Sequence, residues 1–98
     1  MRSEEPLAAI EAWYAAQCDG DWEHSYGLSI ETLDNPGWRV RIDLHGTACA
    51  DRVFDRRETQ RDENDWLSCW VESGSFHASC GPRNLAEALG VFLVWANA

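Results

Sequence analysis

Apolar residues recur at helical spacing near both ends of the chain. The N-terminal stripe consists of Leu7, Ile10, Tyr14 and Cys18. These positions are three or four residues apart, which is the spacing of one helix face. Pro6 suits the first helical position because its missing N–H would have no partner there, and Gly20 suits the end of the helix because it tolerates a positive φ. We therefore predict a helix that starts at Pro6 and ends before Gly20.

The C-terminal stripe consists of Leu85, Leu89, Phe92 and Trp95. Asn84 is a preferred N-cap residue, and Glu87 three positions later completes a capping-box-like pair. Val91, Leu93 and Val94 widen the stripe until the helix is apolar almost all round. Such a helix is covered on more than one side, by the protein core or by a partner. A homodimer through this helix is therefore one possibility.

Between the two helices the apolar period changes to two, as in strands with one buried face. Residues 26–32 alternate in this way, and residues 38–45 repeat the pattern. The face of the second run that we expect to be buried carries Trp38, Val40, Ile42 and Leu44. In the connecting Asn35-Pro36-Gly37, Pro36 fixes φ at the second turn position and Gly37 supplies a positive φ at the third. We predict an antiparallel hairpin.

A third strand around residues 51–59 has only two apolar anchors, and residues 66–72 and 75–80 form a second hairpin across Ser73-Gly74. The order of elements predicts an α+β fold: an antiparallel β-meander of about five strands flanked by an N-terminal and a C-terminal helix packed on one face. A chain of 98 residues supports one core, so we expect a single domain over residues 1–98.

The charge is acidic and unevenly distributed. All eight cationic residues are Arg, against seventeen Asp and Glu, and the formal net charge is −9. Residues 1–34 contribute −7, residues 35–61 contribute +2 and residues 62–98 contribute −4. Such a protein repels nucleic acid and attracts a basic partner. A solubility surface is the alternative interpretation of the same charge.

The sequence has no basic-plus-apolar N-terminal signal and no apolar run of eighteen residues. We expect a soluble protein that stays in the cytoplasm and binds no membrane. Its four cysteines lack the C-x2-C spacing of zinc sites, and we expect reduced, mostly buried thiols. His24, His45 and His77 are scattered along the chain, so we expect no metal and no other cofactor.

Two segments are candidates for catalysis. Glu23 and His24 could act as a base and its orienting partner, but no nucleophile is near them in the sequence, so we favour polar fixation of a loop. Cys80 precedes the last predicted helix, where the helix dipole and Arg83 would lower its pKa. A small sulfurtransferase-like enzyme that uses Cys80 is thus an alternative to a binding protein, against the simpler interpretation of a packed strand-end thiol.

Strand parity indicates a binding surface. In residues 66–72, Leu67, Cys69 and Val71 form one face, and Trp66 and Trp70 lie on the other. If the apolar faces point at the helices, the opposite side of the sheet carries Glu31, Arg39, Arg41, Asp43, Trp66 and Trp70. Trp and Arg together on an open sheet are typical of protein-binding hot spots. A bulge or burial on both faces would instead put the two Trp residues in the core.

The stretches "LAAIEAWYAAQ", "CDGDWEHSYGLSIETLDNPGWRVRIDL" and "NLAEALGVFLVW" resemble the immunity protein 53 family of bacterial polymorphic toxin systems. This resemblance implies a small cytoplasmic α+β protein that binds and neutralises a cognate toxin. It also implies that the shared motif is scaffold, because the surface that faces the toxin must change with the toxin. The scaffold residues would be Gly20, Trp22, Tyr26, Pro36, Gly37 and Trp38.

Our main hypothesis is a binding protein for a basic toxin domain of the nuclease type, with no enzymatic activity of its own. The nuclease class is inferred from charge alone, because an acidic inhibitor mimics the polyanion that such a toxin binds. The predicted toxin-binding residues are Glu23, Glu31, Asp34, Arg39, Arg41, Asp43, Trp66 and Trp70.

Overall fold

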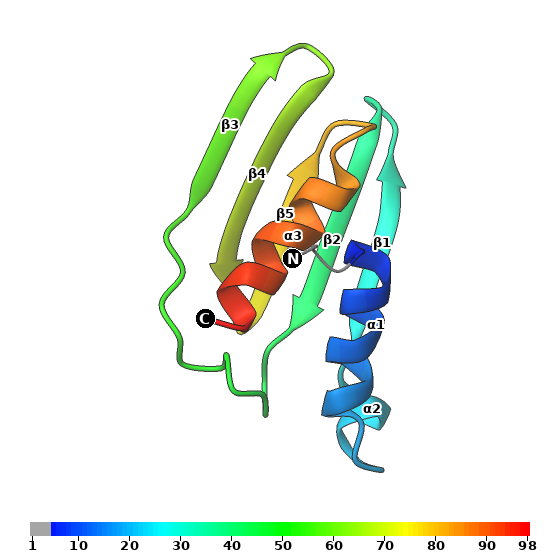
Figure 1. The fold of residues 1–98 in the computed structure, drawn as a ribbon, viewed down its shortest axis with the longest axis vertical. Coiled ribbons are helices and arrows are strands. Elements are labelled where there is room, and N and C mark those ends of the chain that lie inside the picture. The colour runs from blue at the N-terminus through cyan, green and yellow to red at the C-terminus, as the bar shows by residue number, and fades with distance from the viewer. Residues whose placement is uncertain (1–4) are drawn as a thin grey trace.

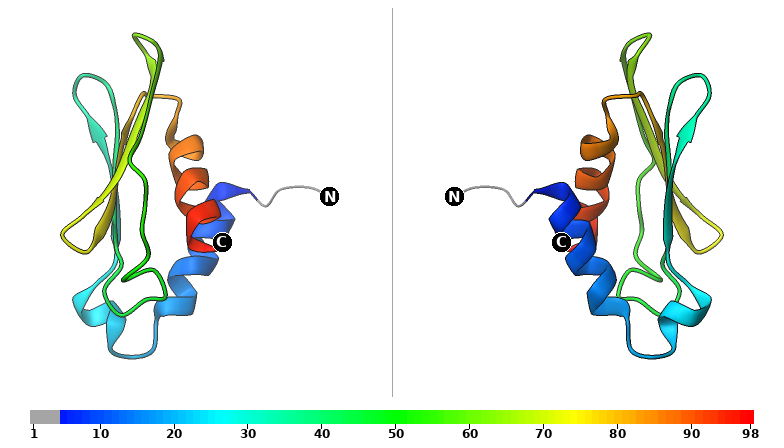
Figure 2. Two further views of the ribbon diagram at one scale, coloured as in Figure 1. Left: turned by 90° about the vertical axis from the view of Figure 1, so that its left-hand side faces the viewer. Right: turned by 90° about the vertical axis from the view of Figure 1, so that its right-hand side faces the viewer.

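The computed structural model describes residues 5–98, which fold into a five-stranded antiparallel sheet with two long helices on one face (Figures 1 and 2). The helices are α1 (Pro6–Gln17), α2 (Trp22–Ser25) and α3 (Leu85–Ala96). The strands are β1 (Leu28–Leu33), β2 (Gly37–Asp43), β3 (Arg57–Asp62), β4 (Asp65–Glu72) and β5 (Ser75–Cys80). The predicted α+β class is confirmed.

Helix α1 begins at Pro6 as predicted, and the Glu5 carboxylate accepts a hydrogen bond from the Ala8 amide at 3.1 Å. The helix ends at Gln17 with an extended residue after it, so Gly20 does not form its end. Gly20 does have a positive φ, of 91°, but this φ serves the next turn, which leads into the short helix α2. The sequence pattern did not predict α2.

The order of strands across the sheet is β1-β2-β5-β4-β3, so β2 neighbours β5 rather than β3. The hairpin β1–β2 and the meander β3–β4–β5 are joined by the β2–β5 pairing. The burial of the side chains in each strand explains this order. Phe76, Ala78 and Cys80 of β5 are fully buried and belong in the sheet centre, whereas β3 has almost only exposed residues and suits an edge.

The long connection from β2 to β3 makes this order possible, and it corrects the predicted third strand. Residues 51–56 are not a strand, and β3 starts only at Arg57. Phe54 packs edge-on against Phe76 and Trp95, with ring centroids 5.4 and 5.3 Å apart. The Trp95 indole donates to the Val53 carbonyl at 2.8 Å. The Phe54 ring and the Val53 carbonyl therefore hold a loop against α3, and the Val53 side chain is exposed instead of anchoring a strand.

The core lies between the sheet and the two long helices, which contact each other. Trp13 of α1 and Phe92 of α3 meet edge to face, with ring centroids 5.0 Å apart. Beneath them lie Ile10 from α1 and the fully buried Ile42 and Phe76 from the sheet. The other face of the sheet has no long helix over it in the described residues (Figure 2).

The role predicted for Gly37 was wrong. Positive φ angles occur at Gly20, Gly46 and Gly74 among the described glycines, but not at Gly37. Gly37 is the first residue of β2, and a Cβ there would lie 2.2 Å from the Cys80 carbonyl oxygen. It is required for close approach of β5, not for the shape of the turn.

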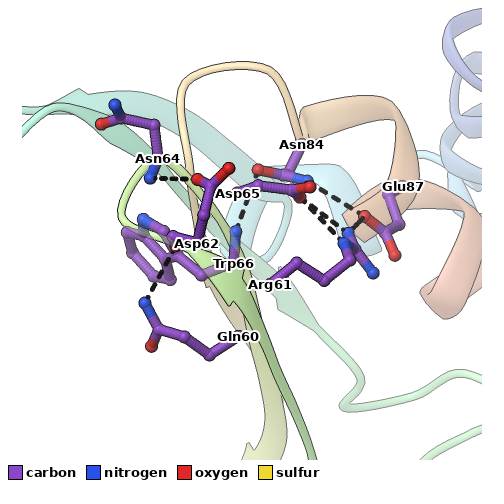
Figure 3. Close-up of polar contacts among 8 residues, drawn as sticks. All are labelled: Gln60, Arg61, Asp62, Asn64, Asp65, Trp66, Asn84 and Glu87. Carbon is purple, nitrogen blue, oxygen red and sulfur yellow. Dashed lines mark hydrogen bonds and ion pairs between the residues drawn. The ribbon is translucent and has the colours of Figure 1, made fainter.

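The predicted capping box at α3 was also wrong. Asn84 stands at the N-cap position, but its side chain makes no capping hydrogen bond. Its amide group instead donates to Asp65 at 2.9 Å and to Glu87 at 3.1 Å, and its oxygen accepts from the Trp66 amide at 3.3 Å (Figure 3). Arg61 bridges the same two carboxylates, so this polar cluster ties α3 to the β3–β4 hairpin.

Candidate functional site

The structure brings most of the predicted site residues together on the side of the sheet away from α1 and α3. Leu67 and Cys69 of β4 are buried against the helices, so the alternating Trp66 and Trp70 point to the opposite side. We call this side the open face, and its central residues are Glu31, Arg39, Arg41, Trp66, Trp70 and His77. Both Trp residues are half-buried there.

One row across the open face is an aromatic stack. The register places Arg41, His77 and Trp70 side by side on β2, β5 and β4. The rings of Trp70 and His77 are stacked, with centroids 5.4 Å apart and an interplanar angle of 14°. The Arg56 guanidinium carbon lies 5.0 Å from the Trp70 ring centroid. The result is a row of stacked, delocalised groups on the open face.

The next row is polar and flat. It runs from Glu31 through Arg39 and two serines to Glu58. Glu31 and Arg39 face each other across β1 and β2, and both are exposed. Because the serines between the charges are short, Arg39 is accessible to a partner from above the sheet.

The Asp43 carboxylate already accepts hydrogen bonds from groups within the protein. It accepts them from the Gly27 amide at 3.0 Å and the Ser75 hydroxyl at 3.1 Å, and it pairs with Arg41. Burial alone would raise the pKa of Asp43, but these three donors together lower the pKa below its usual value. Asp43 therefore joins β1, β2 and β5, and only Arg41 keeps a partly exposed group for contact.

Glu23 also serves the loop that contains it. Its two oxygens accept from the amides of Asp19 and Gly20, at 2.9 and 2.8 Å. The hydrogen bond from its own amide, followed by those two, holds the pKa of Glu23 below its usual value. Glu23 lies in α2, and Asp34 lies in the β1–β2 turn at the opposite end of the sheet (Figure 1). These two acids are not part of the open face.

The aromatic residues between positions 19 and 38 pack within the structure. The Trp22 indole donates to the His45 carbonyl at 2.7 Å, and Trp22 is only 7% exposed. Tyr26 stacks on the His45 ring at 4.7 Å between centroids. The Trp38 indole donates to the Pro82 carbonyl at 3.0 Å. This stretch therefore anchors α2 and the start of the sheet.

Comparison with known protein families shows which family this chain belongs to. A family model described as Immunity protein 53 matches residues 7–97, which run from the first turn of α1 to the end of α3. The chain belongs to the immunity protein 53 family. Comparisons with curated proteins and with solved structures give no match. Membership in this family implies binding to a cognate toxin and its neutralisation, and immunity proteins are typically not enzymes.

In this immunity protein the candidate nucleophile is inaccessible. Cys80 is fully buried under the helices, and burial raises the pKa of its thiol to about 11. The expected lowering of its pKa was wrong, because α3 begins only at Leu85 and Cys80 faces the core instead. A protonated, buried thiol is a packing group rather than a nucleophile.

The histidines lie apart, and within residues 5–98 no group of three His, Cys, Asp or Glu side chains is placed to hold a metal ion. None of the helices in that part of the chain is long and apolar enough to cross a membrane.

On α3, Val94 is 76% exposed and lies with the exposed Val53 beside a hollow of about 440 Å³. The homodimer through α3 stays a prediction.

Sequence reasoning missed two members of the open face. His77 belongs there because β5 alternates buried and half-buried residues, and extending the parity argument to 75–80 would have found it. Arg56 precedes β3, in a segment without periodicity, so no local signal indicated that it lies over Trp70.

Proposed function

We propose that this immunity protein neutralises a basic toxin domain of the nuclease type by covering it with the open face of its sheet. The observation that supports this proposal is the side-by-side arrangement of Trp70, His77 and Arg41, with Arg56 over the Trp70 ring. Trp and Arg are the residue types that most often dominate the binding energy of protein interfaces.

The contact set is smaller than the sequence alone indicated. Trp66 and Trp70 are the anchors, and Glu31 and Arg39 are the exposed charges between them and the sheet edge. Asp43 and Glu23 contribute through the scaffold, because their oxygens already accept hydrogen bonds from the protein itself.

The basic character of the toxin is inferred from the net charge of −9. An acidic protein is steered to a cationic surface and associates faster with it. Proteins that act on nucleic acid have cationic grooves for the phosphate backbone, so an acidic inhibitor competes directly for that groove. This argument favours a nuclease over toxins with neutral substrates.

The test uses the C-terminal domain encoded by the adjacent upstream reading frame, expressed with and without this protein. We expect toxicity, rescue by co-expression and a complex that co-purifies. Degradation of DNA or RNA by the isolated domain, blocked by this protein, would establish the nuclease class. Toxicity without rescue, or without a complex, would overturn the proposed function.

Two variants then test the open face. Arg39→Ala should raise the Kd about tenfold, as expected for an interface contact, although losing a cation makes the protein more attractive to a basic toxin. Arg83→Ala is the matched control, since Arg83 is also exposed but precedes α3, outside the open face. Equal Kd values for both variants would place the interface elsewhere.

A further inference from the structure

The two edges of the sheet differ in how they resist pairing with another strand. Edge strand β3 has charged or amide side chains at all but one position and a register shift between Gln60 and Asp62. Charges and bulges of this kind prevent strand addition. Edge strand β1 has one charged residue, Glu31, no proline and an unbroken register with β2.

The backbone of β1 has hydrogen-bonding groups that point out of the sheet. The Asp43 amide donates to the Gly27 carbonyl at 2.9 Å, so these two residues form a hydrogen-bonded pair. Alternation along an antiparallel ladder then turns Ser29 and Glu31 toward β2. The amides and carbonyls of Leu28, Ile30 and Thr32 therefore point away from β2, at the free edge of the sheet.

An apolar groove runs beside this edge. It has a volume of about 370 Å³ and lies between α1 and β1, which are neighbours in Figure 1. It is lined by Leu7, Ile10, Glu11, Tyr14, Leu28 and Ile30. Leu7 is 54% exposed and Tyr14 is 39% exposed, so the outer wall of the groove is uncovered apolar surface.

The negative charge around the groove indicates which kind of partner would bind there. Residues 5–34, which form both of its walls, contain seven Asp and Glu and no Arg or Lys. A second copy of this chain would bring two such segments together and is disfavoured by like-charge repulsion. A partner segment with Arg or Lys among its apolar residues would be attracted instead.

We propose that β1 pairs with an extended, basic segment of the toxin, which becomes a sixth strand of the sheet. Its backbone bonds to Leu28, Ile30 and Thr32, and its apolar side chains fill the groove beneath Leu7 and Tyr14. Its cationic side chains lie near Glu11 and Glu31. This inference rests on the proposed function and adds the element of the toxin that is recognised.

Amide hydrogen exchange, measured residue by residue with and without the same C-terminal toxin domain, tests the pairing. We expect slower exchange at Leu28, Ile30 and Thr32 in the complex, while Ser29 and Glu31, already bonded to β2, change little. Exchange of the free protein is compared at two concentrations. Slowing that depends on its own concentration would identify a second copy as the occupant and overturn the inference.

Two pairs of variants test the β1 pairing by a second method, which does not depend on hydrogen exchange. Thr32→Pro removes one outward amide at an exposed position, and Thr32→Val keeps it. We expect the proline variant alone to raise the Kd about tenfold. Leu7→Gln should also weaken binding, whereas Val94→Gln, which changes an exposed apolar residue of α3, should not. Thermal melts establish that each variant folds.

The outcomes separate the two proposals. A complex that forms with unchanged exchange at Leu28, Ile30 and Thr32, and with equal affinity for the two Thr32 variants, overturns the β1 pairing and leaves the open-face proposal standing. Absence of any complex overturns the proposed function and this inference with it.

Discussion

Single residues in this protein act through close contacts that their residue type alone does not reveal. Gly37 has no left-handed backbone, yet a side chain there would collide with the Cys80 carbonyl and lie 3.4 Å from the Trp66 ring. Gly27 also has an ordinary backbone, but a Cβ there would meet no atom within 4 Å. Gly27 precedes β1 and Gly37 begins the neighbouring β2, and a side chain would meet other atoms only at Gly37.

Replacing each by alanine separates these roles. Gly37→Ala should lower the free energy of unfolding by about 1–3 kcal/mol, the usual cost of overpacking. Gly27→Ala should be neutral or slightly stabilising, because it restricts only the unfolded chain. Chemical denaturation of both variants measures the difference. A Gly37→Ala variant as stable as the parent would show that the end of β5 can move aside.

At the scale of elements, the joint between α3 and the β3–β4 hairpin is made by a polar cluster. Asn84 is 7% exposed and bonds to Asp65, Trp66 and Glu87, while Arg61 bridges the two carboxylates. The hydrogen bonds from Arg61, followed by that from Asn84, hold the pKa of both Asp65 and Glu87 below the usual value. The hairpin that carries Trp66 is thus oriented by α3 (Figure 3).

The interpretation of Asn84 as a hairpin anchor predicts a result that helix capping does not. Aspartate is as good an N-cap residue as asparagine, so a capping role would make Asn84→Asp neutral. In the observed cluster a third carboxylate beside Asp65 and Glu87 cannot donate to either of them. We expect Asn84→Asp to cost at least as much as Asn84→Ala, about 1–3 kcal/mol for lost buried hydrogen bonds. Urea titration of both, with Arg83→Ala as control, measures this.

At the scale of the whole molecule, charge and contact surface are separated. The open face mixes Arg and Glu, whereas residues 5–34 along α1, α2 and β1 contain carboxylates and no Arg or Lys. If the toxin is basic, as we propose, long-range attraction to it comes mainly from the side of the molecule that contains β1. In the complex that we propose, specificity comes from the Trp and Arg residues of the open face. This division follows the usual roles of distant charge and buried contact in protein association.

Neutralising distant acids should change the association rate and little else. We choose Asp21→Asn, Asp34→Asn and Glu63→Gln together, since all three are exposed loop or turn residues outside the open face. The association rate constant should fall several-fold at low salt, with a nearly unchanged dissociation rate. The difference should shrink at physiological ionic strength, where the Debye length is about 8 Å. Rapid-mixing kinetics at two salt concentrations measures both rates. An unchanged association rate at low salt would rule out electrostatic steering.

The sequence by itself determined the local structure and the faces of the sheet. Helical spacing located α1 and α3, and the period of two located both hairpins, because these patterns follow directly from backbone geometry. The same alternation put Leu67 and Cys69 on one face of β4 and Trp66 and Trp70 on the other. The second face is the one that the helices leave open.

Only the tertiary structure decided how these pieces meet. Strand order depends on which strand can be buried in the centre, so β5 lies beside β2 and leaves β1 and β3 as edges. The roles of Gly37, Asn84 and Cys80 depend on atoms far away in the sequence, and no local pattern contains that information. Periodicity shows which face of a helix or strand is buried, but not which residues pack against it. The roles of these three residues depend on those particular neighbours, which only the packing of the whole chain determines.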